Sequence, residues 1–142
     1  MLTKLNSGER LTDGGVTTGV YSALSLTGET MSAKLNLLVL RCQDLSASKK
    51  FYEQLGFQFH KEQHRTGPVH YAAQLEEMVF ELYPLKPGAA VDQTRLGFRL
   101  SVAGALKERL DRAGIEICDF THHPKYSVYV VQDPDGRKVV LS

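Results

Sequence analysis

Arg41, Glu81 and Arg99 are the side chains whose types and positions are best suited to chemistry. Each lies in or beside an apolar run typical of a β-strand, where burial of an unpaired charge costs several kcal/mol. Two hypotheses explain how this cost is avoided. Either one arginine pairs with Glu81 and holds two strands together, or both arginines present planar guanidinium groups to a carboxylate or phosphate of a ligand.

Two roles are open to the tyrosines near these charges. Under the ligand-binding hypothesis, Tyr83 and one of Tyr126 or Tyr129 supply aromatic walls and hydroxyl groups. Under the alternative, they pack in the core or against neighbouring strands, as tyrosines at sheet positions commonly do.

The histidines lie at predicted strand ends or in loops, without an i, i+4 helical pair or an HxH pattern. We interpret them as polar surface or loop residues; they are His60, His64, His70, His122 and His123. Two alternatives stay open: an atypical metal site built from Glu81 and histidines, and a lid or general base formed by His122-His123 beside Pro124.

Other chemistries leave no signal in the sequence. There is no GxSxG motif, no phosphate-cradling glycine loop, no CxxC pair and no basic stripe with aromatic residues. The formal net charge of +1 gives no reason to expect a nucleic acid or a membrane as partner. Cys42 and Cys118 fit no metal or redox spacing. With no apolar run of about 18 residues and no signal-peptide pattern, we expect a cytoplasmic protein with free thiols.

Alternating strands and amphipathic helices position these residues from Lys34 onward. Asp44 is a suitable N-cap for a helix, and Gly56 is a suitable residue to end it. Around that helix we predict strands over residues 35–42, 57–60, 71–75 and 78–85.

The second half of the chain repeats this plan. When the sequence is aligned with itself so that Arg41 falls on Arg99, the first predicted helix falls on a second one. The inward-facing residues and the terminal glycine of the two helices then coincide. Leu45, Ser48, Tyr52, Leu55 and Gly56 fall on Ala103, Leu106, Leu110, Ala113 and Gly114. A repeat of this length predicts a duplicated unit whose halves cover each other's apolar face.

Length and composition favour a single domain. A chain of 142 residues, 42% of them hydrophobic, can bury one core. We predict this domain over residues 34–142, with modules at about 34–86 and 93–142. Residues 1–33 are rich in Ser, Thr and Gly with weak periodicity, so we predict an N-terminal arm there.

The opening and closing segments of this domain carry a family resemblance. Residues 38–45 (LVLRCQDL) and 51–57 (FYEQLGF) resemble the opening βα unit of the vicinal-oxygen-chelate superfamily, which includes glyoxalases, bleomycin resistance proteins and extradiol dioxygenases. Residues 133–136 (DPDG), followed by an apolar strand, are similar to its closing hairpin. The resemblance implies an α+β fold in which two βαβββ modules form curved mixed sheets around a cleft, usually in a homodimer.

The resemblance also implies where a metal would be held. In metal-binding members, four His or Glu side chains on cleft-facing strands hold a divalent metal that polarises substrate oxygens. Here those positions are Leu37, Glu81, Arg95 or Gly97, and Val140. A lone carboxylate does not hold a divalent metal well, so we predict no metal and no other cofactor.

Strand alternation then predicts the lining of the cleft, because residues two apart share a face. The predicted ligand-binding residues are Leu37, Val39, Arg41, Tyr83, Arg95, Arg99 and Val140. Glu81 is the candidate catalytic residue.

These observations favour a metal-independent small-molecule-binding protein that sequesters an anionic or aromatic ligand in its cleft. Two alternatives stay open. One is a lyase or isomerase in which Glu81 is the general base and Arg41 or Arg99 stabilises an enolate-like anion. The other is a non-catalytic dimer whose cleft is filled by its own side chains.

Overall fold

The computed structural model describes residues 23–24, 30–101 and 105–142, and the chain divides into two units, Met1–Lys34 and Leu35–Ser142. In the first unit, β1 (Ala23–Leu24) pairs antiparallel with β2 (Thr30–Met31). The rest of the predicted arm lies outside the described residues, and its boundary at residue 33 stays a prediction.

The second unit contains two modules with the same order of elements. The first module consists of β3 (Leu37–Cys42), α1 (Leu45–Gln54), β4 (His60–Glu62), β5 (His70–Leu75) and β6 (Met78–Pro84). The second consists of β7 (Leu96–Phe98), α2 (Leu106–Ala113), β8 (Ile117–His123), β9 (Tyr126–Gln132) and β10 (Lys138–Leu141). The predicted α+β fold of two βαβββ modules is confirmed.

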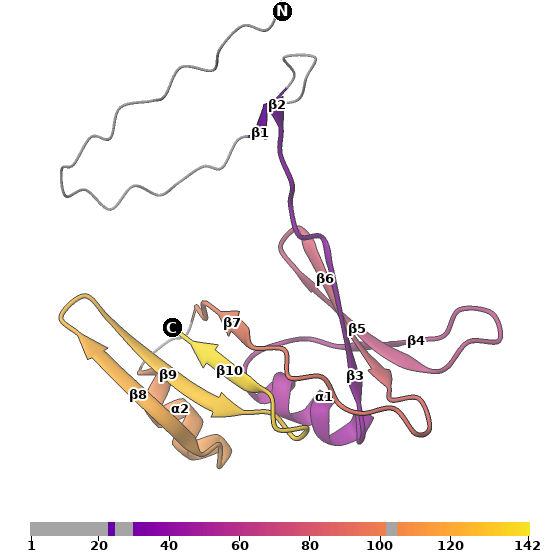
Figure 1. Cartoon of the computed structure of the whole chain (residues 1–142). Helices are drawn as coiled ribbons and strands as arrows, with labels where there is room; N and C mark the ends of the chain where they lie inside the picture. Colours follow the sequence, from indigo (N-terminus) through magenta and orange to yellow (C-terminus); the bar gives the residue numbers. More distant parts are fainter. Residues whose placement is uncertain (1–22, 25–29, 102–104) are drawn as a thin grey trace, which may run out of the picture. The chain divides into compact units, whose positions relative to one another are not determined.

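Each module forms its own four-stranded mixed sheet (Figure 1). The strand orders are β3-β6-β5-β4 and β7-β10-β9-β8. In both sheets the first strand of the module runs parallel to the last, and the remaining pairs are antiparallel. The helix between the first and second strands supplies the crossover that a parallel pair needs.

Capping residues mark the ends of the two helices. The Asp44 side chain accepts a hydrogen bond from the Ala47 backbone N–H at 2.8 Å, which confirms the predicted N-cap of α1. Gly56, with φ of 108°, follows α1, and Gly114, with φ of 68°, ends α2. Only glycine adopts such angles without strain, so both predicted stops have a physical cause. Ala103, which the repeat places in the second helix stripe, lies outside the described residues.

The strand predicted over residues 57–60 is wrong. The backbone N–H of Phe57 donates to the Tyr52 carbonyl at 3.2 Å, so it closes the end of α1 instead of joining a ladder. Phe57 is buried, and strand pairing begins only at His60 in β4.

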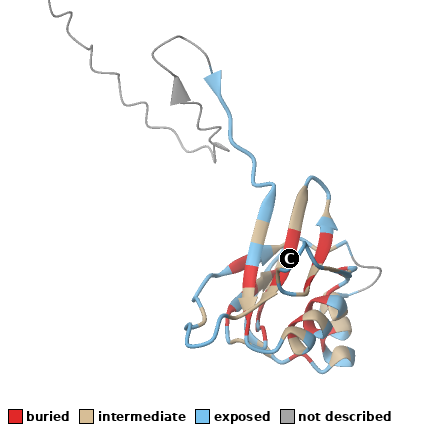
Figure 2. Cartoon of the chain, turned by 90° about the vertical axis from the view of Figure 1, so that its right-hand side faces the viewer, coloured by how far each residue is buried: buried red, intermediate tan, exposed pale blue. Residues whose placement is uncertain are grey.

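One core lies between the helices and the sheets. Alternate residues of the inner strands face it, and Figure 2 shows the resulting mixture of buried and exposed positions along the sheets. Phe80 of β6 and Phe98 of β7 come from different modules, yet their ring centroids are 5.9 Å apart. The side chain of Tyr52 contacts both rings. The two halves therefore share one aromatic core, as the repeat predicted.

A fully buried arginine fastens the two modules together. Arg137, in the turn before β10, forms ion pairs with Asp92 at 2.6 Å, Asp133 at 3.2 Å and Asp135 at 3.1 Å. Its Nη2 also donates to the backbone carbonyl of Arg41 at 2.6 Å. The 133–136 turn is therefore more than a hairpin connection, because it holds the end of β3 in the other module.

The same network includes the hydroxyl of Tyr52, which donates to Asp133 at 3.0 Å. Burial, together with the charge of Asp133, raises the pKa of Tyr52 well above its usual range. Within the described part of the chain, no helix is long and apolar enough to cross a membrane.

Candidate functional site

The sheet faces opposite the helices, called here the open faces, carry the residues singled out in the sequence. On the first sheet, the parallel pairing of β3 with β6 places Arg41 opposite Tyr83 and Val39 opposite Glu81. Leu37 lies two residues before Val39 and is half exposed. These five predicted residues therefore share one face, as strand alternation requires.

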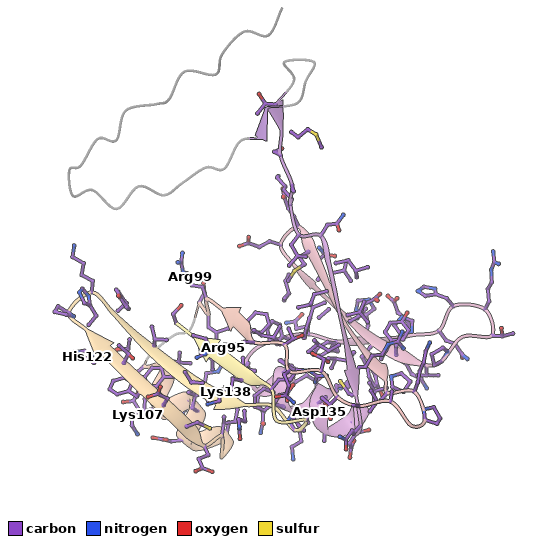
Figure 3. All side chains as sticks on the ribbon, viewed as in Figure 1. Arg95, Arg99, Lys107, His122, Asp135 and Lys138 are labelled. Atoms are coloured by element: carbon purple, nitrogen blue, oxygen red, sulfur yellow. The ribbon has the colours of Figure 1, made fainter. Side chains whose placement is uncertain are left out.

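The remaining predicted residues lie on the open face of the second sheet. Val140 of β10 pairs with Gly97 of β7, and Arg95 and Arg99 flank that glycine on the same side. Figure 3 shows Arg95, Arg99 and Lys138 along β7 and β10. The predicted ligand-binding residues thus form two groups, one on each sheet.

Neither arginine pairs with Glu81. In the described part of the chain, no ion pair joins Glu81 to Arg41 or to Arg99, so the strand-holding hypothesis is wrong. The guanidinium of Arg41 instead lies over the ring of Tyr83, 4.7 Å from its centroid. A cation in this position is attracted to the negative face of the ring. Partial burial and the nearby charge of Glu81 raise the pKa of Tyr83, and Arg41 opposes them.

A pocket of about 460 Å³ opens beside this cation–π pair. Its lining consists of Arg41, Pro68, Tyr83, Pro84, Leu85, Lys86 and Pro87. Two cations and an apolar wall therefore meet in one concave surface, which suits a small anion that carries an apolar or aromatic group.

The second module has a counterpart of about 530 Å³ around Arg99. The other lining residues are Leu100, Tyr126, Val128 and Ser142. Arg99 is the repeat partner of Arg41, while Ser142 directly follows β10, at the position that corresponds to Tyr83 in the first module. Tyr129 does not line this pocket, because it is buried on the opposite face and stacks on Phe120 at 4.9 Å.

The interpretation of all histidines as surface or loop residues is wrong for His70. Its side chain is 1% exposed at the start of β5, and it stacks on Tyr83 with ring centroids 4.1 Å apart. Its Nδ1 lies 3.2 Å from the carbonyl oxygen of Pro68, and its Nε2 lies 3.2 Å from the Tyr83 hydroxyl. Because a carbonyl oxygen only accepts, Nδ1 is the donor, and Nε2 of the neutral ring accepts from Tyr83.

Glu62 of β4, which the sequence did not single out, gathers three histidines around its carboxylate. Its Oε1 lies 2.8 Å from Nε2 of His60, and its Oε2 lies 3.4 Å from Nε2 of His64 and 3.5 Å from Nε2 of His70. Glu81 reaches the same cluster, with Oε1 4.0 Å from Nε2 of His70. The antiparallel pairing of Glu62 with His70 creates this arrangement.

The other two histidines lie on the β8–β9 hairpin and are exposed. Nδ1 of His122 lies 3.2 Å from the Ser127 hydroxyl, and the ring of His123 stacks on Tyr126 at 4.6 Å. Their predicted role as a lid or general base is not tested by this arrangement.

Comparison with solved structures supports the fold. An antibiotic binding protein from Streptomyces sp. CB03234, TnmS3, aligns with a TM-score of 0.63 at 21% identity, over 78% of this chain and 95% of that one. A lactoylglutathione lyase from Agrobacterium tumefaciens aligns with a TM-score of 0.57 at 17% identity, over 78% of this chain and 92% of that one. A glyoxalase family protein from Enterococcus faecalis aligns with a TM-score of 0.57 at 21% identity, over 76% of this chain and 95% of that one.

No curated protein matches the chain significantly. A sequence model of the Glyoxalase/Bleomycin resistance protein/Dioxygenase superfamily matches residues 34–141, which is nearly all of the second unit. The order of the modules, the mixed sheets and this match agree with one another. The chain belongs to the Glyoxalase/Bleomycin resistance protein/Dioxygenase superfamily.

Proposed function

We propose that this protein binds a small aromatic anion in the pocket of Arg41 and Tyr83, without the metal centre of its family and without converting the ligand. One observation carries the proposal: the guanidinium of Arg41 lies over the Tyr83 ring and has no carboxylate partner among the described residues. A ligand carboxylate can therefore pair with this charge without first breaking an ion pair. The similar fold of an antibiotic binding protein is consistent with such a role.

The positions of the family's metal ligands support binding without that centre. Leu37 and Val140 lack donor atoms, and Gly97, which pairs with Val140, has no side chain. Glu81 is the one carboxylate left among these positions, and a divalent metal needs several convergent donors.

We further propose that the protein acts as a homodimer. Leu37 and Val39 are apolar residues on the open face of β3, with 48% and 37% of their surface exposed. β3 is also an edge strand of its sheet. An exposed apolar edge is typical of a surface that a second chain covers.

Titration with salicylate, and with the uncharged salicylamide as its matched comparison, tests the ligand proposal. We expect salicylate to bind and salicylamide to bind more weakly, because a charge-assisted pair contributes about 1.5–3 kcal/mol. Arg41→Gln should raise the Kd for salicylate about tenfold or more. Arg112→Gln, on the exposed side of α2, is the control and should leave the Kd unchanged.

Unchanged salicylate affinity in Arg41→Gln would refute the pocket assignment. Loss of affinity in Arg99→Gln alone would place the ligand in the pocket of the second module. Isothermal titration gives the affinity of each variant, and the thermal shift at saturating ligand checks it independently.

A lyase or isomerase is the second candidate, and it is favoured by the carboxylate of Glu81, which pairs with His70 but with no arginine among the described residues. Without an arginine partner, Glu81 can accept a proton from a bound substrate. Turnover of a substrate found by screening should then fall by at least about a hundredfold in Glu81→Gln. Unchanged turnover would exclude Glu81 as the base.

A further inference from the structure

We propose that Glu62, His64 and His70 form a zinc-binding site on the open face of the β4–β5 hairpin. This site lies within one module, and none of its three ligands stands at one of the four positions where the family resemblance places a metal; of those positions, only Glu81 borders the site. It goes beyond the proposed ligand binding, because it depends neither on Arg41 nor on an organic ligand. Each of the three side chains offers one ligand atom, and these atoms lie within 4.8 Å of one another.

The distances already approach those of a tetrahedral zinc site. Zinc binds imidazole nitrogen and carboxylate oxygen at about 2.0–2.1 Å, so two ligands of a tetrahedron lie about 3.4 Å apart. The carboxylate oxygen of Glu62 lies 3.4 Å from the His64 nitrogen and 3.5 Å from the His70 nitrogen. The two histidine nitrogens lie within 4.8 Å of each other, so side-chain rotations that bring them closer would place the three atoms around one ion.

His70 is preorganised as a ligand. Its Nδ1 donates to the Pro68 carbonyl at 3.2 Å, so the lone pair of the ring is on Nε2, 3.5 Å from Oε2 of Glu62, and zinc would take this lone pair in place of the Tyr83 hydroxyl. Metal-binding histidines commonly donate their second nitrogen to a backbone carbonyl in this way. Burial of the ring and its stacking on Tyr83 fix its orientation further.

The carboxylate of Glu62 is oriented by a different neighbour. His60 contacts Oε1 at 2.8 Å, so Oε2 remains directed toward the other two histidines. His64 is held near it by a short turn, in which the Gly67 N–H donates to the His64 carbonyl at 2.9 Å. The side chain of Gln63 donates to the Gly67 carbonyl at 2.9 Å and fastens the same turn.

The local charge favours a cation. Within the described chain, Glu62 and Glu81 form ion pairs only with histidines, whose neutral form leaves the two carboxylates uncompensated. Glu81 Oε1, 4.0 Å from the His70 nitrogen, is placed to complete the coordination directly or through a water molecule. His64 is 71% exposed, so the ion can enter from solvent.

Zinc titration of the full-length, tag-free protein after treatment with a chelator tests this site. We expect one zinc ion per chain with a micromolar or lower Kd, and cobalt should give the intense visible absorption of a four-coordinate site. His64→Asn and Glu62→Gln should each weaken zinc binding at least about tenfold. Both side chains are accessible to solvent, so neither change should prevent folding, and circular dichroism checks this.

His122→Asn is the matched control. The shift that places Arg41 on Arg99 places His64 on His122, which is also exposed on a hairpin but lies outside the cluster. Its zinc affinity should equal that of the unaltered protein, and Arg41→Gln should likewise retain zinc, even if it no longer binds salicylate. Absence of zinc binding, affinity unchanged in both His64→Asn and Glu62→Gln, or loss of zinc in His122→Asn would each overturn the proposal.

Discussion

Replacement of Arg137 by methionine should destabilise this fold more than most single substitutions. The guanidinium is 0% exposed, and the side chains of Asp133 and Asp135 are 0% and 2% exposed. Methionine has a similar volume but no charge, so the substitution leaves two buried carboxylates without a cation. Breaking a buried ion pair from one side costs about 3–5 kcal/mol, a large share of the roughly 5–15 kcal/mol that stabilise a typical domain.

The effect should be visible in both chemical and thermal unfolding. We expect the free energy of unfolding to fall by about 3–5 kcal/mol and the Tm by about 12–20 °C for a unit of this size. Urea titration followed by far-ultraviolet circular dichroism measures the first, and tyrosine fluorescence gives a second probe, since the chain has six Tyr and no Trp. Coincidence of the two curves shows whether unfolding is two-state.

Two further variants separate the buried charge from a general effect of substitution. Lys107→Met breaks the exposed pair with Asp111 on α2 and should leave the urea midpoint unchanged. Asp133→Asn added to Arg137→Met removes one of the stranded charges and should recover part of the loss. A loss below about 1 kcal/mol in Arg137→Met would refute the view that this network fastens the modules.

Three other outcomes follow from the structure. The guanidinium of Arg137 holds the pKa of the Asp92 carboxyl well below its usual range, so the stabilising contribution of Asp92 is present above about pH 4 and is lost at lower pH. The urea midpoint should therefore fall less steeply with decreasing pH in Asp92→Asn than in the unaltered protein. Burial raises the pKa of the Cys42 thiol to about 11, so at about pH 8 a thiol reagent should label exposed Cys118 alone until urea unfolds the chain; fast labelling in Cys118→Ser would contradict this. The double substitution Leu37→Glu and Val39→Glu should convert the proposed homodimer to a monomer, which light scattering measures as a halved molecular mass. An unchanged mass would place the interface elsewhere.

Local sequence signals predicted most of the fold because they act over a few residues. The Asp44 cap and the glycines at 56 and 114 bound the helices through hydrogen bonds and backbone angles that depend on neighbours alone. The strand predicted after α1 begins too early, because a local signal was also used there. Phe57 has the apolar character of a strand residue, but its N–H is used by the end of the helix.

The candidate site could be predicted only in part, because side-chain partners depend on the register between strands. Alternation correctly placed Arg41 and Glu81 on one face. The register puts Arg41 directly opposite Tyr83 and Glu81 opposite Val39, and this selects the cation–π contact over an ion pair. Nothing in the local sequence fixes that register.

The cluster around Glu62 was beyond prediction for a related reason. A turn of seven residues, 63–69, separates β4 from β5, and its conformation sets which residues pair. A slip of one residue would move His70 from the open face to the core face. Glu62 and His70 therefore gain their relationship from the turn, which includes a left-handed Arg65 with φ of 53°.

Duplication gave the two modules one backbone plan, but the two open faces now differ in chemistry. Across the first sheet, one row of side chains runs from Arg41 through Tyr83 and His70 to Glu62. Two aromatic rings therefore lie between a cation and a carboxylate. The second sheet has Arg99 near Ser142 and Val128, and the residues that line its pocket include no His, Asp or Glu. Tyr83 contacts both Arg41 on the pocket side and His70 on the cluster side, so an anion at Arg41 and a cation at His70 would be held by opposite neighbours of one ring. Because such charges attract each other, salicylate should bind more tightly to the zinc-loaded protein than to the zinc-free one.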